Sequence, residues 1–488
     1  MDGAPELFAR LASQGAMIER LSSDSRRCAP GVAFFAYPGE QADGRRYIGD
    51  AVRRGASAVV WDDRGFEWPA DLRLPNAPLS GLKERAGSLA HEFYGRPSES
   101  LWVCGVTGTN GKTSSSQWIA AALGECGTKA AVLGTLGSGF PGALAAGMNT
   151  TPDALEVHRL LREFLRAGAR AAAMEVSSHG LVQGRVNAVA FDCALFTNLT
   201  HDHLDYHGSM EAYGEAKARL FDAPGLSAAV LNLDDVFGVQ LARRLAARGV
   251  RTIGYSLSPA GAAPGGVSEF IAARAIAADR LELVSSWGEA AVRFRQLGRF
   301  NVANALGVLG CLVASGVPFL QAAGRLETLP AVRGRMERVA EEPLVVVDYA
   351  HTPDALEKVL AALRPVASAR GGRLAVVFGA GGDRDPAKRP VMGELAERLA
   401  DRVWLTSDNP RSEEPLAILR DIEAGMRRAH DVEPQREAAI RRAIAEAAPR
   451  DVVLIAGKGH EEYQEIRGTR LPFSDAAVAR AALGKGSA

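Results

Sequence analysis

Residues 101–113 read Leu-Trp-Val-Cys-Gly-Val-Thr-Gly-Thr-Asn-Gly-Lys-Thr, and this stretch decides the fold of the middle of the chain. The apolar run Leu101–Val106 predicts a strand, and a helix is expected from about Lys112 to Gly124. Glycines let a backbone wrap closely around phosphate oxygens, and a helix N-terminus supplies N–H donors. In such a loop Lys112 would neutralise the β- and γ-phosphates of a nucleotide, and the Thr113 hydroxyl would bind Mg²⁺.

The match to the common G-x₄-G-K-[ST] phosphate loop is incomplete, because Val106 stands where that pattern has its first glycine. A glycine-rich turn that binds nothing is the alternative. The preceding strand, the following helix, Lys112 and Thr113 together favour the phosphate loop. A phosphate loop alone does not distinguish a ligase from a GTPase, a motor or a kinase.

Strands alternate with helical stretches on both sides of this loop, which predicts an α/β fold. Working outward, the expected strands after it are 171–176, 194–197, 228–231 and 252–255, in a central P-loop-type parallel sheet. A second alternation, with strands at 344–347, 374–378, 403–406 and 452–456, predicts a C-terminal Rossmann-like doubly wound domain. The Pro- and Leu-rich segment Asp71–Ser80 is expected to be an extended connection rather than a strand or helix. The predicted domains are 1–97, 98–330 and 331–488.

Composition narrows the functional classes. The 488 residues hold 57 Lys plus Arg against 57 Asp plus Glu, which argues against a nucleic-acid partner because such binding needs clustered positive charge. Five cysteines without a CxxC pair indicate reduced thiols. The N-terminus lacks a signal-peptide pattern, and no apolar run is long enough to span a bilayer. These features predict a soluble, cytoplasmic protein without membrane insertion.

Acidic, imidazole and amino side chains follow the phosphate loop. Glu175 ends a predicted strand and is placed to hold a cation. Residues 197–207 contain three histidines and two aspartates, His203 among them, so zinc is one interpretation and a single imidazole contributing to Mg²⁺ is the favoured one. Lys217 lies in a helical stretch, where an isolated lysine would ordinarily be a solvated surface residue.

Taken together, these motifs resemble those of the Mur ligase family, which includes folylpolyglutamate synthetases. The matching segments, in chain order, are GTNGKT at 108–113, MEVSSHG at 174–180, NLTHDHLDYHG at 198–208, EAKARLF at 215–221, GRFNVANALG at 298–307, DYAHTPDAL at 348–356 and GKGHE at 457–461. They extend over almost the whole chain in a fixed order. The resemblance implies a ligase that activates a carboxylate as an acyl phosphate and joins it to an amine, with an N-terminal domain that binds the UDP of a UDP-MurNAc-peptide.

The resemblance also implies roles for individual residues around ATP. Lys112, Glu175, His203 and Lys217 would form the catalytic set. Two Mg²⁺ ions would be held by Thr113, Glu175, His203 and Lys217, the last as N6-carboxylysine, a carbamate that turns the lysine into an anion. The ATP-binding residues implied are Gly108, Thr109, Asn110, Gly111, Lys112, Thr113, Ser114, Asn304, Arg335 and Asp348.

Two further groups are implied for the other substrates, UDP-MurNAc-L-Ala-D-Glu and meso-2,6-diaminopimelate. The UDP-MurNAc-dipeptide would contact Ser23, Ser25, Gln41, Ala42, Asn149, Thr150, Thr151, Ser177, Gln183 and Arg185. Many relatives carry His where this chain has Glu40. Diaminopimelate would contact Arg384, Asp408, Asn409, Pro410, Arg411, Gly457 and Glu461.

The choice of amino acid depends on Asp408-Asn-Pro-Arg411, a form that accompanies diaminopimelate in the family, whereas lysine-adding relatives lack the arginine. A guanidinium can bind the extra carboxylate of diaminopimelate bidentately. The alternatives are the same reaction with L-lysine, a folylpolyglutamate-type ligase and a P-loop NTPase switch or nucleic-acid motor. We expect a monomer whose partners are small-molecule substrates.

Overall fold

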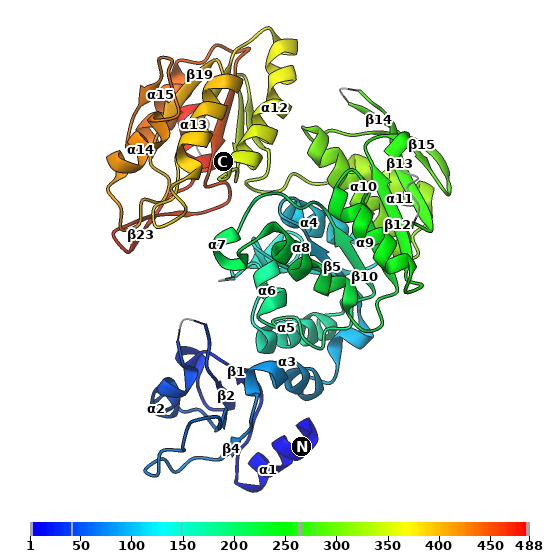
Figure 1. The fold of residues 1–488 in the computed structure, drawn as a ribbon, viewed down its shortest axis with the longest axis vertical. Coiled ribbons are helices and arrows are strands. Elements are labelled where there is room, and N and C mark those ends of the chain that lie inside the picture. The colour runs from blue at the N-terminus through cyan, green and yellow to red at the C-terminus, as the bar shows by residue number, and fades with distance from the viewer. Residues whose placement is uncertain (1–2, 41, 148, 262–265, 278, 485–488) are drawn as a thin grey trace.

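The computed structural model describes residues 3–40, 42–147, 149–261, 266–277 and 279–484. Gln41, which was predicted to contact the UDP-linked substrate, lies outside these residues. Figure 1 shows three parts in chain order, with the N-terminal part at one end of the molecule, the central part in the middle and the C-terminal part at the other end. Each part is built on its own sheet.

The N-terminal sheet has four parallel strands in the order β1-β2-β3-β4. Its elements are α1 (Ala4–Ser13), β1 (Arg20–Ser22), β2 (Val32–Ala36), α2 (Ile48–Arg53), β3 (Ala58–Trp61), β4 (Asn76–Pro78) and α3 (Leu82–Phe93). Strands β2 and β3 are buried on both faces, as apolar runs in parallel sheets usually are.

The prediction that residues 71–80 form an extended connection rather than a strand is wrong for three of them, because Asn76–Pro78 forms β4 beside β3. Pro78 pairs with Trp61 at the sheet's outer edge. Proline has no N–H to donate to a ladder, so it is tolerated only on such an edge. The proline that argued against a strand therefore marks an edge strand here.

The central sheet has eleven strands in the order β15-β14-β13-β12-β11-β10-β5-β9-β6-β7-β8. The strands are β5 (Trp102–Thr107), β6 (Ala130–Gly134), β7 (Gly137–Phe140), β8 (Ala143–Ala145), β9 (Ala171–Glu175), β10 (Cys193–Phe196), β11 (Ala228–Asn232), β12 (Arg251–Ser256), β13 (Glu269–Ile276), β14 (Arg280–Ser285) and β15 (Gly288–Arg293). The helices are α4 (Lys112–Glu125), α5 (Ala154–Arg166), α6 (Ser178–Val182), α7 (Leu204–His207), α8 (Met210–Ala218), α9 (Val236–Ala246), α10 (Arg299–Ala314) and α11 (Phe319–Arg325). Apolar clusters cover both faces of this sheet.

The predicted parallel sheet is confirmed from β6 through β9, β5, β10, β11 and β12 to β13. Antiparallel strands extend it at both ends, with β7 and β8 on one side and β14 and β15 on the other. These additions were not predicted. The half-polar strand β15 and the glycine-rich β7 lack the continuous apolar run that identifies a central parallel strand.

The C-terminal sheet has the order β16-β17-β21-β18-β19-β20, parallel except for the antiparallel edge strand β16. Its elements are β16 (Glu337–Glu341), β17 (Leu344–Asp348), α12 (Pro353–Arg370), β18 (Leu374–Phe378), α13 (Lys388–Leu399), β19 (Arg402–Leu405), α14 (Pro415–Glu423), β20 (Asp431–Val432), α15 (Arg436–Ala445), β21 (Val452–Ala456), the hairpin β22 (Tyr463–Ile466) and β23 (Thr469–Pro472), and α16 (Asp475–Ala482). The expected doubly wound domain is therefore present. Loops at the carboxyl ends of β17, β19 and β21 meet at one edge, where open α/β sheets bind ligands.

Within the described ranges, none of the helices combines the length and the apolar composition that a bilayer crossing requires.

Candidate active site

The phosphate loop joins β5 to α4 as predicted. Gly111 caps the helix with φ +86°, and a Cβ at this position would lie 2.3 Å from Oδ1 of Asn304, so only glycine fits. Lys112 bends back over the loop, and its Nζ donates to the carbonyl oxygens of Gly108 and Thr109, at 2.9 Å each. Desolvation lowers the pKa of Lys112, although Glu175 acts against this shift. The loop thus surrounds a partly desolvated ammonium group.

Glu175 lies at the end of β9 beside this loop and is fully buried. Its Oε2 accepts hydrogen bonds from the Thr113 hydroxyl at 2.9 Å and the Thr135 hydroxyl at 3.0 Å. Its Oε1 accepts from the Thr135 backbone N–H at 2.8 Å. A carboxylate and a threonine hydroxyl are oxygen donors of the kind that Mg²⁺ prefers. The residues present therefore fit the predicted metal role.

Lys217 comes from α8 and is also buried, with 1% of its surface exposed. Its Nζ donates to the Gly108 carbonyl at 3.0 Å and lies 4.2 Å from the centre of the Tyr213 ring. Burial lowers the pKa of Lys217 well below the usual range, and the positive charge of Lys112 adds to the effect. The structure thus places Lys217 directly behind the phosphate loop, and the solvated surface position is excluded.

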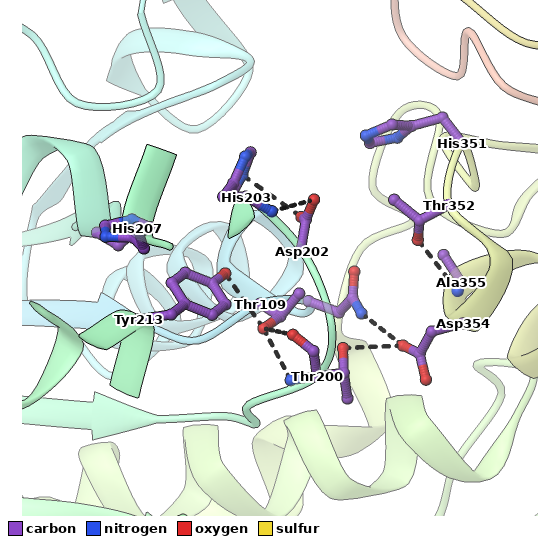
Figure 2. Close-up of polar contacts among 12 residues, drawn as sticks. Thr109, Thr200, Asp202, His203, His207, Tyr213, His351, Thr352, Asp354 and Ala355 are labelled. Atoms are coloured by element: carbon purple, nitrogen blue, oxygen red, sulfur yellow. Dashed lines mark hydrogen bonds and ion pairs between the residues drawn. The ribbon is translucent and has the colours of Figure 1, made fainter. Parts of the chain in front are cut away.

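His203 also lies beside the Tyr213 ring, with 6.1 Å between the two ring centres. Figure 2 shows His203 close to Asp202, whose carboxylate lies 3.4 Å from Nε2 of His203. The Tyr213 hydroxyl is in turn 3.2 Å from Oγ1 of Thr109. Desolvation lowers the pKa of His203. His203 and Lys217 therefore both lie near the same aromatic ring at the phosphate loop.

The zinc interpretation of residues 197–207 is not supported. In the parts of the chain that the structure describes, three or more metal-ligating His, Cys, Asp or Glu atoms gather only at Cys104, Cys193 and Cys311, inside the core. His207 instead contacts the Ser178 hydroxyl at 3.0 Å. His203 and His207 pack against the Tyr213 ring, and His207 also packs against Tyr206.

A cavity of about 820 Å³ opens from the phosphate loop toward α10 and α12. Asn304, Arg335 and Asp348 all line it, together with residues 109–114 of the loop. Both carboxylate oxygens of Asp348 accept backbone hydrogen bonds, from Met336 at 2.7 Å and Ala350 at 2.8 Å, while burial raises the pKa of this group. All of the predicted ATP-binding residues except Gly108 thus line one cavity.

Asp354 joins the central and C-terminal parts at this cavity and was missed by sequence reasoning. Its Oδ2 accepts from the Asn110 amide and the Thr200 hydroxyl, both at 3.1 Å, and from Lys358 at 2.9 Å (Figure 2). Arg335 adds a second link, because its guanidinium donates to the Thr113 hydroxyl at 3.3 Å. The sequence signal that could have identified Asp354 is its position in the DYAHTPDAL segment, which resembles the family.

A second group of predicted residues meets at the carboxyl ends of β19 and β21. The Asn409 side-chain amide donates to Oε2 of Glu461 at 2.8 Å. Lys458, fully buried and not singled out from the sequence, donates to Oδ1 of Asn409 and to Oε2 of Glu461, at 2.9 Å each. Lys458 therefore fixes the orientation of both predicted diaminopimelate contacts.

Asp408 lies in the same group and has one oxygen free. Its Oδ1 accepts from the Asn409 backbone N–H at 2.7 Å, and its buried Oδ2 has no hydrogen-bond partner within the described chain. A Cβ at Gly457 would lie 2.4 Å from that Oδ2, which explains the glycine. Behind it, the buried pair Arg436–Asp475 (2.7 Å) holds the Ala456 carbonyl at 2.9 Å. Sequence reasoning missed this ion pair, whose two residues stand 39 positions apart.

Arg411 and Arg384 both approach Gly381, since a Cβ there would be 3.0 Å from Nη1 of Arg411 and 3.7 Å from Cγ of Arg384. Arg411 has φ +51°, and its Nη1 donates to the Gly382 carbonyl at 2.6 Å. Arg384 is exposed and donates to the Asp383 carbonyl at 3.2 Å. The two arginines are therefore close together. Arg411 is fixed by its hydrogen bond to the Gly382 carbonyl, whereas Arg384 lies at the surface. Pro410 is buried beside them.

Among the residues predicted for the UDP-linked substrate, Gln183 lies where the N-terminal and central parts meet. Arg185 donates to the Thr151 carbonyl at 2.9 Å, and the Thr151 and Ser177 hydroxyls are 3.1 Å apart. Across the boundary, Glu40 accepts from the Gln183 amide at 2.6 Å and the Tyr206 hydroxyl at 2.7 Å. The remaining predicted residues are Thr150, bonded to Thr135, buried Ser25, exposed Asn149, and Ser23 and Ala42 of the N-terminal part.

Comparison with known proteins agrees with this geometry. Family models match three consecutive segments, "Mur ligase family, catalytic domain" at 17–94, "Mur ligase middle domain" at 106–312 and "Mur ligase, glutamate ligase domain" at 334–459. The UDP-N-acetylmuramoyl-L-alanyl-D-glutamate–2,6-diaminopimelate ligase of Chromobacterium violaceum is 52% identical over 99% of this chain and 97% of its own length. The enzyme of the same name from Pseudomonas aeruginosa is 50% identical over 97% and 96%.

Solved structures show the same architecture. The structure of a UDP-N-acetylmuramoyl-L-alanyl-D-glutamate–2,6-diaminopimelate ligase is 36% identical and matches with a TM-score of 0.66 over 96% of this chain and 95% of that one. MurF ligase from Thermotoga maritima, in complex with ADP, shares the fold at 19% identity, with a TM-score of 0.65 over 91% and 95%. With three matched segments, full-length relatives and the same three-part fold, this chain belongs to the Mur ligase family.

Proposed function

We propose that this chain is the ATP-dependent ligase that joins meso-2,6-diaminopimelate to the D-Glu carboxylate of UDP-MurNAc-L-Ala-D-Glu, forming a UDP-MurNAc-tripeptide, ADP and phosphate. The observation that carries the proposal is the group of Asp408, Asn409, Arg411 and Glu461 at one sheet edge, in a chain half identical to diaminopimelate ligases over its full length. The product's use in peptidoglycan synthesis follows from its muramoyl peptide.

For ATP, we assign the triphosphate to residues 108–114 and Arg335, the adenine to Asn304 and the ribose to Asp348. All of them either line the cavity or form the phosphate loop. Backbone N–H groups at the start of α4 and the Lys112 ammonium offset negative charge on the phosphates. The Asp348 carboxylate is held by two backbone donors, which leaves it oriented for a ribose hydroxyl.

For the metals, Thr113 and Glu175 are assigned to one Mg²⁺, and His203 with carbamylated Lys217 to the other. The fit rests on donor chemistry, since hydroxyl, carboxylate and carbamate oxygens suit a hard cation and an imidazole can add to them. A carbamate forms when a neutral amine attacks CO₂ and loses a proton. The lowered pKa of Lys217 supplies that neutral amine. When bound, the ions would offset charge on the transferred phosphoryl group.

The reaction then takes two steps. A D-Glu carboxylate oxygen attacks the γ-phosphorus, the bond to the β-phosphate oxygen breaks, and ADP leaves. The amine of diaminopimelate next attacks the acyl carbon, phosphate departs, and the amine gives up a proton. Asp408, with its free buried Oδ2, is placed to hold that amine in the correct orientation.

For the amino acid, Arg411 is assigned to the distal carboxylate of diaminopimelate, with Arg384, Asn409, Pro410, Gly457 and Glu461 as the other contacts. L-Lysine lacks that carboxylate, so it would leave the Arg411 guanidinium without its anion, a penalty of about 1–3 kcal/mol. Selectivity for diaminopimelate over lysine follows from this difference.

The UDP-MurNAc-dipeptide is assigned to Ser23, Ser25, Gln41 and Ala42 in the N-terminal part and to Asn149, Thr150, Thr151, Ser177, Gln183 and Arg185 in the central part. The contact of Gln183 with Glu40 of the N-terminal part and that of Arg185 with Thr151 support this assignment. Glu40 stands where many relatives have His, and here it contacts Gln183 and Tyr206 instead. The monomeric state and the cytoplasmic location stay predictions from the sequence.

Two other functions fit less well. A bifunctional folylpolyglutamate synthase/dihydrofolate synthase structure shares the fold at 20% identity. That function would not explain the predicted UDP-binding residues of the N-terminal part or Arg411. A P-loop NTPase switch would not explain why Asn409, Lys458 and Glu461 are brought together at the carboxyl ends of β19 and β21.

Phosphate release tests the proposal. We expect release to require ATP, UDP-MurNAc-L-Ala-D-Glu and meso-diaminopimelate together, and to disappear in Lys112→Ala. Release that continues without the muramoyl dipeptide, or that responds to a folate substrate and glutamate, would contradict it.

A further inference from the structure

Three cysteines from three different elements meet in the core of the central domain. Cys104 lies on β5, Cys193 on β10 and Cys311 on α10, and each has no exposed surface. The Sγ of Cys311 is 3.8 Å from the Sγ of Cys104 and 4.0 Å from the Sγ of Cys193. All three sulfur atoms lie within 4.8 Å of one another. None of them takes part in the ligase reaction proposed above.

The fold holds these sulfurs together from two directions. Cys104 and Cys193 are direct partners in the parallel ladder between β5 and β10, so their side chains share one face of the sheet. Helix α10 lies against that face. It approaches closely because of its glycines, since a Cβ at Gly310 would lie 2.7 Å from the Val230 side chain. The triangle of sulfurs is therefore set by sheet register and helix packing.

The spacing of the sulfurs suits a metal ion at the centre of the triangle. A cation at that point, with metal–sulfur distances of about 2.3 Å, requires sulfurs about 4.0 Å apart. The two separations of 3.8 and 4.0 Å agree with this value. Three-coordinate binding would therefore need little movement of the surrounding core.

The ligand set selects the type of cation. Zinc sites in proteins are completed by a fourth ligand, and within the described chain no His, Asp or Glu joins this group. The Tyr255 hydroxyl in this core already donates to the Phe196 carbonyl at 3.1 Å. Thiolates are soft ligands that favour Cu(I).

We propose that Cys104, Cys193 and Cys311 form a binding site for one Cu(I) ion in three-coordinate sulfur geometry. No electrons move on binding, and each thiol that becomes a thiolate releases its proton to solvent. The three elements lead to the ATP site, since β5 enters the phosphate loop, β10 leads to Asn198 and α10 carries Asn304. A bound ion would cross-link these elements and stabilise the native state over the unfolded chain.

Copper binding by the reduced, full-length protein tests the site. The protein is incubated without oxygen with Cu(I) buffered by a chromophoric chelator, and retained copper is measured with the ultraviolet charge-transfer absorption and luminescence of Cu(I)–thiolate centres. We expect about one tightly held ion per chain and a higher melting temperature. Cys311→Ala should lose both, whereas the matched control Cys28→Ala/Cys126→Ala, which removes the two cysteines outside the group, should keep both.

The other outcomes overturn the proposal. Wild-type protein that retains no copper would mean that the cysteines pack only as small apolar side chains. Equal uptake by wild type and Cys311→Ala, or loss of uptake in the Cys28→Ala/Cys126→Ala control, would place the copper elsewhere. Circular dichroism checks the fold of each variant. Cys193→Ala is the second variant if Cys311→Ala does not fold.

Discussion

Two buried lysines, Lys217 beside the phosphate loop and Lys458 in the C-terminal domain, have opposite surroundings. Lys217 contacts a carbonyl oxygen and the face of Tyr213. Lys458 contacts the amide oxygen of Asn409 and the carboxylate of Glu461. Burial disfavours a charged amine, and a carboxylate partner restores it. Two equally buried lysines therefore differ in their partners: burial holds the pKa of Lys217 well below its usual range, whereas Lys458 is fixed by an amide oxygen and a carboxylate.

The largest effect is expected at the lysine without a carboxylate partner. Lys217→Ala should lower kcat by about 10³-fold, because a catalytic group acting on developing charge contributes on this scale. Initial rates of phosphate release measure it. If the carbamate is the active form, added short carboxylates should restore part of the rate.

The matched control for this change is Lys129→Ala, which removes a surface ammonium bound to the Ala167 carbonyl. It should keep the wild-type rate. Wild-type activity in Lys217→Ala would remove this residue from the mechanism.

The second-largest effect is expected for Lys458, the lysine that contacts the Glu461 carboxylate. Lys458→Met should lower kcat/KM for diaminopimelate by about 100-fold, since breaking a buried ion pair costs about 3 kcal/mol. The KM for ATP should not change, and this split separates a positioning role from general damage to the fold. Adding Glu461→Gln to Lys458→Met should cost less than the two single changes together, as expected for residues in contact. A loss shared equally by all three substrates would contradict the positioning role.

A smaller effect is expected on selectivity. Arg411→Ala should reduce the ratio of kcat/KM for diaminopimelate to that for L-lysine by about 10- to 100-fold, the value of a charge-assisted hydrogen bond. Arg467→Ala, which removes a side chain that is 84% exposed nearby, is the control and should leave the ratio unchanged. An unchanged ratio in Arg411→Ala would remove Arg411 from carboxylate recognition.

The smallest effect is the pH dependence of the carbamate. A proton and CO₂ compete for the Lys217 amine, so the carbamate is present above the lowered pKa of Lys217 and lost as pH falls through it. The loss cannot exceed about tenfold per pH unit. Carbon-13 NMR with labelled bicarbonate measures the carbamate. The signal should persist in Lys458→Met and disappear in Lys217→Ala; a signal in Lys217→Ala would place the carbamate elsewhere.

The sequence predicted best where function is encoded in consecutive residues. The strand, loop and helix at 101–124 and the strands at 374–378 and 452–456 match the structure closely, because continuous apolar runs between glycine-rich turns have few other folds. The strands β4, β7, β8, β14 and β15, which lie at or next to the margins of their sheets, were missed. Their short, half-exposed or glycine- and proline-containing segments carry no such pattern.

Contacts between distant segments were beyond prediction from residues alone. Lys458 meets Asn409 across 49 positions, and Asp354 meets Asn110 across 244. In the sequence, nothing distinguishes these residues from ordinary polar residues, because their partners are far away along the chain. The copper site is the same case, since three cysteines scattered over 207 positions become neighbours only through sheet register and helix packing.

A competition experiment tests the proposed function most directly. The protein is supplied with ATP, UDP-MurNAc-L-Ala-D-Glu and equal concentrations of meso-diaminopimelate and L-lysine, and the products are separated by mass. The account predicts that the diaminopimelate-containing tripeptide accumulates with one ADP per product. A lysine-containing tripeptide as the main product, or ADP formed without any tripeptide, would contradict it.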